Sequence, residues 1–353
     1  MSLPTSDKQY PDPAQLNNYL REIRGSVEAI PGVRETAFTC ALPLQGACYG
    51  MPMQVANRPM VDRANRRGGF FKIVSPSYFH TLGIKLLRGR ALTDHDTKGA
   101  PPALVINDRL AHQYFPNENP VGQRILIQEI IPGKTQLGSE IAWEVAGVIA
   151  DEKVNGLQDE RSAGVYVSYD QTPAYGMNLV VRANGDPLQL QKFITSAIHA
   201  VNKDQAISDV QTLDQIKDLS SVGSRLEAAL LGVFAAVALL LAAVGIYGVI
   251  SYSVVQRTHE MGIRAALGAS AGNLLKLVLY RGLLLTGGGL AIGLGGTFAL
   301  TRAMATLLYG VGARDPVTMA FVGAILAGVA LAACYLPARR ATQVDPTVAL
   351  RYE

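Results

Sequence analysis

Residues 230–250 read LLGVFAAVALLLAAVGIYGVI and contain no charged side chain. The apolar run around them extends over about 226–255, with Arg225 and Glu227 at one end and Arg257 just beyond the other. A helix needs ~20 apolar residues to cross the ~30 Å hydrocarbon core of a bilayer. This stretch therefore predicts a transmembrane helix, and it decides the class of the protein.

Two further apolar blocks follow, at about 274–300 and 317–336. The last block is preceded by Asp315 and Pro316 and is expected to end at Pro337. Aspartate followed by proline is a common opening of a helix, because the carboxylate caps free N–H groups and proline has none to lose. The remaining residues could hardly cover three such helices in a soluble protein, so we expect three membrane spans.

Composition changes sharply where the first block begins. Of the 353 residues, 49% are hydrophobic and only 17% are charged, whereas soluble proteins average about 25% charged residues. Residues 1–220 read as an ordinary globular mixture, and residues 221–353 alternate apolar blocks with short basic segments. We therefore expect two domains. The net charge of +4 and the lack of a basic, aromatic-rich stripe argue against a nucleic-acid partner.

Basic residues in the short loops predict the orientation of the spans. They occur in the loop between the first two blocks and in the C-terminal tail, as Arg257, Arg264, Lys276, Arg339, Arg340 and Arg351. Short loops rich in Lys and Arg stay in the cytoplasm, so we expect the large N-terminal domain outside and the C-terminus inside. The first 15 residues lack a signal-peptide pattern, so export of this domain would require a preceding segment.

The N-terminal domain is predicted to have an α+β fold. Apolar side chains at helical spacing predict a helix over 13–30, and further helices are expected at 108–114 and 187–201. Strands are expected at 33–40, 70–74, 103–106, 124–131, 143–149, 165–167 and 179–182. The residues after Leu213 are expected to form one helix that continues into the first span, which would suit a protein that passes on movement.

The loop at 256–272 has the pattern of a short amphipathic helix. Glu260 and Arg264 are four residues apart, a spacing that stabilises helices. Gly268 suits the C-terminal cap of that helix, and Ser270 suits the start of the next. The apolar side of this helix would face the membrane or a partner protein. A simple interfacial connector is the alternative.

Several segments resemble one known family. The loop segment RTHEMGIRAALGA at 257–269 is similar to the signature loop of the MacB/FtsX-type ABC permeases, and PARRA at 337–341 is similar to their ending, as are DP at 345–346 and ALR at 349–351. Segments similar to their periplasmic core domain are SPSYF (75–79), LGI (82–84), LRGR (87–90), YFP (114–116), NPVG (119–122) and VAGV (145–148). The resemblance covers nearly the whole chain and is greatest to the second half of the large duplicated permeases of Acidobacteria.

The resemblance implies a fold and a set of partners. It implies a two-lobed α+β periplasmic domain, with an inserted lobe at about 78–131, followed by an all-α domain of three transmembrane helices in the bacterial inner membrane. It also implies that the loop docks on a separate ABC ATPase through Glu260, Gly262, Arg264, Leu267 and Gly268. Further expected partners are a second permease half or a dimer partner, a periplasmic adaptor and membrane lipids. The family's leading helix is not found, so the chain looks like half a permease.

Two residue pairs have a possible structural role. Gly289 and Gly293 form a GxxxG pattern, which lets helices approach closely. A nucleotide-binding glycine loop is disfavoured, because no strand precedes these residues and no lysine follows them. Cys40 and Cys48 lie close in sequence and could form a disulfide if the domain faces an oxidising compartment, but sequence alone does not fix their geometry.

No catalytic motif is found. None of the five histidines belongs to an HExxH motif, and no GxSxG motif occurs. Asp94, His95 and Asp96 suit either a metal site or, more simply, a turn before a helix. We expect no catalytic site, metal or cofactor, and hydrolysis of ATP by a partner. The sequence thus predicts a permease or mechanotransmission subunit of an ABC-type export system. The alternative is a non-transporting membrane regulator or scaffold that signals to a periplasmic partner.

Overall fold

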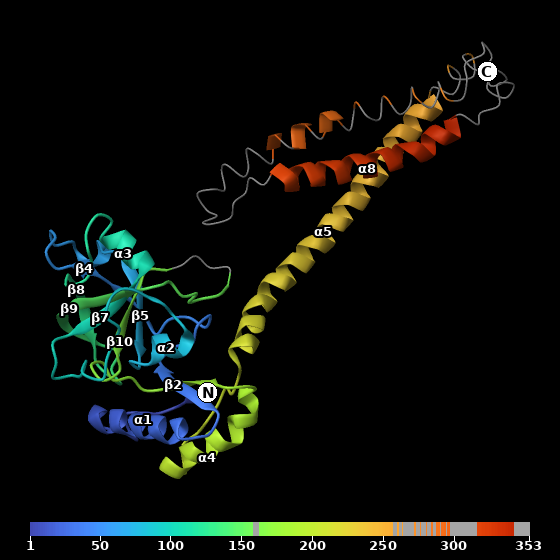
Figure 1. Cartoon of the computed structure of the whole chain (residues 1–353). Coiled ribbons are helices and arrows are strands. Elements are labelled where there is room, and N and C mark those ends of the chain that lie inside the picture. The colour runs from blue at the N-terminus through green and yellow to red at the C-terminus, as the bar shows by residue number, and fades with distance from the viewer. Residues whose placement is uncertain are drawn as a thin grey trace. The chain divides into compact units, whose positions relative to one another are not determined.

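Figure 1 shows the chain as a computed structural model, which describes residues 1–157, 162–256 and 316–341 together with single positions between 260 and 296. The chain divides into two units, Met1–Gly223 and Ser224–Glu353. This division lies three residues from the domain boundary expected at 220.

The first unit is an α+β fold around one mixed sheet, which has eleven strands among the described residues. The strands are β1 (Ser2–Leu3), β2 (Val33–Thr39), β3 (Tyr49–Pro52), β4 (Gln54–Val55), β5 (Gly68–Val74), β6 (Leu86–Gly89), β7 (Ala103–Asn107), β8 (Arg124–Ile130), β9 (Leu137–Ile149), β10 (Gly164–Ser168) and β11 (Met177–Ala183). The helices are α1 (Pro13–Glu28), α2 (Tyr78–Leu82), α3 (Asp108–Tyr114) and α4 (Gln191–Val201), with short 3-10 helices at Arg63–Asn65 and Pro187–Leu190.

The strand order is β1-β11-β2-β5-β10-β7-β9-β8-β4, with β3 beside β5 and β6 beside β9. β5 runs parallel to β10 and β7 runs parallel to β9, whereas the other pairs are antiparallel. Gly164 lies opposite Phe70 in the β5–β10 pair. A Cβ at Gly164 would lie 2.2 Å from the Phe70 ring, so only glycine fits at this position.

Both faces of the sheet are buried, because alternate side chains of a strand point to opposite faces. Phe71 and Ile73 of β5 belong to one hydrophobic cluster, which includes Leu16, Leu20 and Ile23 of α1. Phe70 and Val74 of the same strand belong to a second cluster on the other face. The helix α1 begins at Pro13, where the side chain of Asp12 accepts a hydrogen bond from the Ala14 N–H at 2.9 Å.

The helices and strands expected in this unit are confirmed within two residues, with two exceptions: β9 begins at Leu137 rather than at 143, and 3-10 helix forms the start of the helix expected at 187–201. The structure adds β1, β3, β4, β6 and α2. Strands β6, β7 and β8 come from the segment 78–131 and are hydrogen-bonded into the common sheet. These strands do not form a sheet of their own among the described residues, so the separate lobe expected at about 78–131 is not confirmed and stays a prediction.

The second unit contains most of α5 (Leu213–Gln256) and all of α8 (Pro316–Ala341). Among the described residues, α5 alone is long and apolar enough to span a membrane, and α8 contains a shorter apolar stretch, Phe321–Ala333. The span expected at 274–300 lies mainly outside the described residues. The expected end at Pro337 is wrong, because α8 continues to Ala341. A proline removes one backbone hydrogen bond without having to end an apolar helix.

Candidate functional site

The helix α5 begins at the surface of the first unit, and one side chain near its start, Ile216, is buried in the core of that unit. The Thr212 hydroxyl accepts a hydrogen bond from the Gln215 N–H at 3.2 Å, and the Gln215 side chain accepts one from the Thr212 N–H at 2.9 Å. This reciprocal capping box fixes the first turn of the helix. One residue later, Ile216 is only 3% exposed. The start of α5 therefore contacts the core of the α+β unit through Ile216, and the helix is 44 residues long in all.

Ile216 belongs to the hydrophobic cluster that we call the anchor cluster. Its buried members are Ala37, Leu42, Phe70, Val74, Tyr78, Phe79, Leu92, Val105, Ile149, Val154, Tyr166, Val180 and Ile216. Tyr166 contacts Phe70 and Phe79 edge-on, with ring centroids 5.4 and 5.3 Å apart. Edge-on aromatic pairs add about 0.5–1.5 kcal/mol each beyond their buried area, so the anchor cluster is a firmly packed base for α5.

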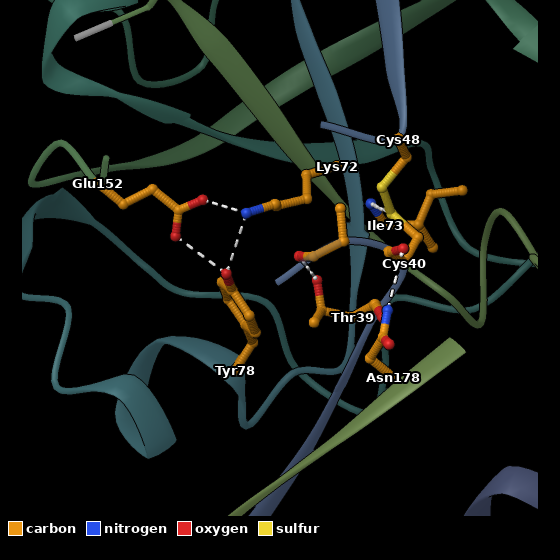
Figure 2. The surroundings of a disulfide bond; sticks show 9 residues. Thr39, Cys40, Cys48, Lys72, Ile73, Tyr78, Glu152 and Asn178 are labelled. Atoms are coloured by element: carbon orange, nitrogen blue, oxygen red, sulfur yellow. Dashed lines mark hydrogen bonds and ion pairs between the residues drawn. A yellow bond between two sulfur atoms is a disulfide. The ribbon is translucent and has the colours of Figure 1, made fainter. Parts of the chain in front are cut away.

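A buried ion pair lies against the anchor cluster (Figure 2). Lys72 of β5 contacts Glu152, which follows β9, and the side chains are 0% and 6% exposed. The Tyr78 hydroxyl donates to Glu152 Oε2 at 2.9 Å and accepts a hydrogen bond from Lys72 Nζ at 3.3 Å. Burial lowers the pKa of Lys72, which the Glu152 carboxylate partly offsets, and burial raises the pKa of Tyr78.

The structure joins Cys40 and Cys48 by a disulfide with a Cα–Cα distance of 5.8 Å. Cys40 follows β2 directly and Cys48 precedes β3 directly. Figure 2 shows the disulfide beside β5, the strand that carries Lys72, and the Ile73 N–H of this strand donates a hydrogen bond to Cys40 Sγ at 3.0 Å. Cys40 packs against the other hydrophobic cluster, on the opposite side of β5 from the ion pair, and loop 41–47 connects the two cysteines.

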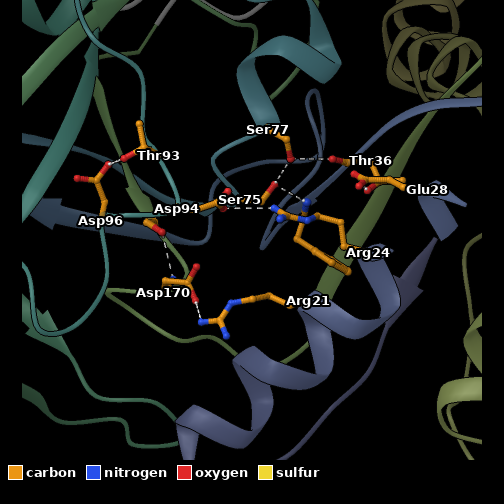
Figure 3. A network of polar contacts seen from close by, with 12 residues as sticks. Arg21, Arg24, Glu28, Thr36, Ser75, Ser77, Thr93, Asp94, Asp96 and Asp170 are labelled. Carbon is orange, nitrogen blue, oxygen red and sulfur yellow. Dashed lines mark hydrogen bonds and ion pairs between the residues drawn. The ribbon is translucent and has the colours of Figure 1, made fainter. Parts of the chain in front are cut away.

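A second polar network ties α1 to the loops beside it (Figure 3). Arg21 contacts Asp170 at 2.7 Å and Arg24 contacts Asp94 at 3.5 Å. Burial raises the pKa of Asp170, and the hydrogen bond from Arg21 opposes this shift. These contacts are structural ones, since they fasten a helix to the core.

The candidate metal motif at 94–96 is a turn held by ion pairs. Arg90 donates two hydrogen bonds to Asp96, each of 2.8 Å, and the Thr93 N–H donates a third. Asp94 points to Arg24 instead. Within the part of the chain that the structure describes, no three His, Cys, Asp or Glu side chains come together as metal ligands would.

The ATPase-contact residues expected in the loop 256–272 are only partly described. Glu260 lies in helical backbone and is exposed, whereas Gly262, Arg264, Leu267 and Gly268 lie outside the described residues. Gly289 and Gly293 have helical backbone, and the helix packing expected of them stays a prediction.

Sequence reasoning missed the Lys72–Glu152 pair and the buried position of Ile216. One signal was present, because Lys72 interrupts the apolar strand GGFFKIV at 68–74. A lysine between core residues indicates a buried partner of opposite charge. Its partner is 80 residues away, and only the fold brings the two together.

Two family models match the chain. The MacB-like periplasmic core domain matches residues 20–213, and the FtsX-like permease C-terminal domain matches residues 232–346.

Curated proteins with related sequences were also found. The macrolide export ATP-binding/permease protein MacB 2 of Yersinia pestis bv. Antiqua (strain Antiqua) is 27% identical over 328 residues, which are 88% of this chain and 46% of that protein. The uncharacterized ABC transporter permease YknZ of Bacillus subtilis (strain 168) is 27% identical over 296 residues, covering 79% of this chain and 69% of YknZ. The chain thus spans about half the length of the MacB protein.

Solved structures with a likeness to the chain include the periplasmic region of MacB from Actinobacillus actinomycetemcomitans. Its TM-score is 0.37 at 16% identity, covering 55% of this chain and 79% of that one. The extracellular domain of the transporter YknZ from Gram-positive bacteria has a TM-score of 0.35 at 16% identity and covers 53% of this chain and 84% of that one.

Proposed function

The chain belongs to the MacB/FtsX-type ABC transporter permease family, and from this premise we propose that it passes movement between its transmembrane helices and its external domain. The driving reaction would be ATP hydrolysis by a separate ATPase subunit. The chain itself would carry no catalytic site. Its likeness to one half of a duplicated permease stays a prediction.

The uninterrupted helix α5 is the observation that carries this proposal. Its first turn is packed into the anchor cluster through Ile216, and its apolar part is long enough to cross a bilayer. A helix is stiff along its axis because each turn is hydrogen-bonded to the next. A displacement of the membrane part would therefore reach the core of the external unit without a flexible joint.

The membrane placement follows from the family and from α5. Members of this family are inner-membrane proteins with a periplasmic domain. We further infer three spans, with the unit Met1–Gly223 outside the membrane and the C-terminus in the cytoplasm. The basic residues of the short loops support this orientation.

The ATPase contact is proposed at the loop 256–272. Glu260, Gly262, Arg264, Leu267 and Gly268 would form it, and the resemblance of this loop to the family's signature loop supports the assignment. A charge and a close-fitting glycine at such a contact would both be sensitive to substitution, because an unpaired charge or a bulky side chain prevents docking.

Co-purification with the ATPase tests this assignment. We expect Glu260→Lys and Gly268→Trp each to reduce co-purification of the ATPase at least tenfold, a loss of about 1.4 kcal/mol in binding. Glu22→Lys is the matched control, because Glu22 is an exposed residue of α1 in the external unit. Retention of the ATPase by both loop variants would overturn the proposed contact.

An efflux assay then separates the export role from the regulatory alternative. Cells that carry the chain with its ATPase should expel a substrate that cells without the chain retain. Unchanged efflux combined with intact ATPase binding would instead favour a non-transporting regulator of a periplasmic partner.

A further inference from the structure

The Cys40–Cys48 disulfide closes a loop at one edge of β5. Both flanking strands pair with this edge, since Thr39 of β2 lies opposite Val74 and Tyr49 of β3 lies opposite Phe71. The disulfide therefore fixes the distance between two strands that follow one another along β5. Residues 41–47 therefore form a closed loop whose two ends, Cys40 and Cys48, are held 5.8 Å apart between their Cα atoms.

The closed loop holds the segment that follows β9. The Leu44 N–H donates to the Lys153 carbonyl at 3.1 Å, and the Gly46 N–H donates to the Val154 carbonyl at 2.8 Å. Leu44 has a φ of 67°, a left-handed conformation that a leucine keeps only where its surroundings fix it. Loop and segment also meet in the anchor cluster, to which Leu42 and Val154 both belong.

The held segment carries one half of the buried ion pair. Glu152 directly precedes Lys153, and its carboxylate contacts both Lys72 and Tyr78 (Figure 2). A charged lysine with no exposed side-chain surface depends on this carboxylate, because an unpaired buried charge is strongly destabilising. Displacing residues 152–154 would therefore break the ion pair and open one side of the anchor cluster.

The disulfide is reachable from solvent. Both cysteines are partly exposed. Cys48 lines a surface groove of about 870 Å³, together with Tyr49, Arg109 and Asn155. Cys40 lies deeper against β5, where its Sγ accepts a hydrogen bond from the Ile73 N–H at 3.0 Å. An incoming thiolate would thus meet Cys48 first, and the Ile73 N–H would stabilise the thiolate that leaves as Cys40.

We propose that Cys40–Cys48 is a redox modification site, at which a dithiol reductant releases loop 41–47 and with it the Lys72–Glu152 pair beside the anchor of α5. One thiolate of the dithiol attacks Cys48 Sγ and forms a mixed disulfide, while the Cys40 thiolate leaves and takes up a proton. The second thiol of the reductant displaces Cys48. Two electrons pass to the protein, and the reductant departs as its own disulfide.

The regulatory consequence rests on the proposed function. The oxidised chain would hold the anchor cluster rigid, so that α5 and the external unit move together. The reduced chain would loosen the base of α5 and weaken the transmission of movement. The structural part of the proposal is independent of any ATPase and can be tested on the purified full chain.

Amine labelling of Lys72 is the direct test. The full chain in detergent is treated with or without dithiothreitol, labelled with an amine-reactive reagent and analysed by mass spectrometry. We expect reduction to raise the labelling rate of Lys72 by about tenfold or more, since labelling requires the pair to open. The exposed Lys203 should label equally in both states and serves as the internal reference.

Hydrogen exchange and two variants complete the test. Reduction should speed amide exchange in loop 41–47 and at residues 152–154, but not in β7. The variant Cys40→Ser/Cys48→Ser should behave as the reduced chain and should not respond to dithiothreitol. Glu152→Gln should label fast at Lys72 even when oxidised, because it breaks the ion pair while the disulfide remains.

Two results would overturn the proposal. One is unchanged labelling of Lys72 and unchanged exchange at 152–154 after complete reduction, verified by the mass of the alkylated thiols. The other is a rise in exchange throughout the sheet, β7 included, which would make the disulfide a general staple of the domain. Neither result bears on the ATPase contact, which the Glu260→Lys experiment tests separately.

Discussion

Asp96 is a single buried carboxylate that holds the turn before β7. Its side chain is 6% exposed and receives two hydrogen bonds from Arg90 and two from Thr93. Burial alone would raise the pKa of Asp96, but the donors at Arg90 and Thr93 prevail and hold the pKa below its ordinary value of 3.8. The folded state therefore favours the ionised form.

This shift makes the effect of Asp96→Asn depend on pH. A carboxylate whose pKa is lowered by folding stabilises the folded state fully when the pH is above its pKa in the unfolded chain. This stabilisation is lost as the pH falls through its pKa in the folded protein. We expect Asp96→Asn to lower the free energy of unfolding by about 1–3 kcal/mol at neutral pH. The difference from the unmodified chain should shrink as the pH is lowered below about 4.

Urea unfolding followed by the fluorescence of Trp143 provides the measurement. Trp143 is the single tryptophan of the chain and is buried in the first unit, so its signal reports on that unit in the full-length protein. Asp94→Asn is the control. Its side chain is 68% exposed, and a surface ion pair contributes about 0–1 kcal/mol. A loss at Asp96 that is equal at pH 3 and pH 7 would contradict the assigned role.

Single residues were the hardest feature to predict from the sequence. The sequence favours a turn over a metal site at 94–96, but it does not indicate that Asp94 pairs with Arg24 of α1, far earlier in the chain. Lys72 likewise finds Glu152 only after β5 and β9 have joined one sheet. Pairings of this kind depend on non-local packing, which periodicity and spacing do not encode.

At the scale of elements, α5 is the feature on which the proposed function depends. Gly223 lies within this helix, at the end of the first unit. A proline at this position would remove a backbone N–H and clash with the preceding turn, at a cost of about 3 kcal/mol. We expect Gly223→Pro to abolish ATP-driven export while the ATPase still co-purifies, because the contact loop is unchanged.

Gly223→Ala is the matched control for this variant. A Cβ at Gly223 would meet nothing within 4 Å, and alanine favours the helix by about 1 kcal/mol over glycine, so export should be retained. Trp143 fluorescence should show that the first unit is folded in both variants. Normal export by the proline variant would show that a continuous α5 is not needed to transmit movement.

Elements with a local signature were predicted well. The amphipathic spacing of α1 and the apolar run of α5 are visible in the sequence itself. The strands β1 and β4 have only two residues each, too few for an alternating pattern, and they form because longer strands lie beside them. The passage of α8 through Pro337 was missed because proline usually indicates a helix end.

At the scale of the whole molecule, composition indicates two domains, but it does not indicate the order of the strands in the sheet. β5 pairs in parallel with β10, about ninety residues later in the chain. Burial on both faces of the sheet stabilises this parallel pair, because β5 and β10 each place apolar side chains in both hydrophobic clusters. A list of strands in sequence order is compatible with many other orders.

Orientation in the membrane is the whole-molecule property that the loop charges predict. We expect a cysteine at exposed Thr135, in the turn before β9, to react with a membrane-impermeant maleimide in intact spheroplasts. A cysteine at Glu260 should react only after permeabilisation, because the basic loop stays in the cytoplasm. Both substitutions, Thr135→Cys and Glu260→Cys, would be made in a Cys334→Ser background with the Cys40–Cys48 disulfide intact.

The reverse labelling pattern would contradict more than the orientation. It would put Cys40 and Cys48 in the cytoplasm, where thiols are kept reduced and disulfides are rare. Loop 41–47 would then be open in the working protein, and the Lys72–Glu152 pair would lose the support that the disulfide gives it. The expected pattern instead places the disulfide in an oxidising compartment, where it persists until a dithiol reduces it. Its reduction would then loosen the packing around Ile216 at the start of α5.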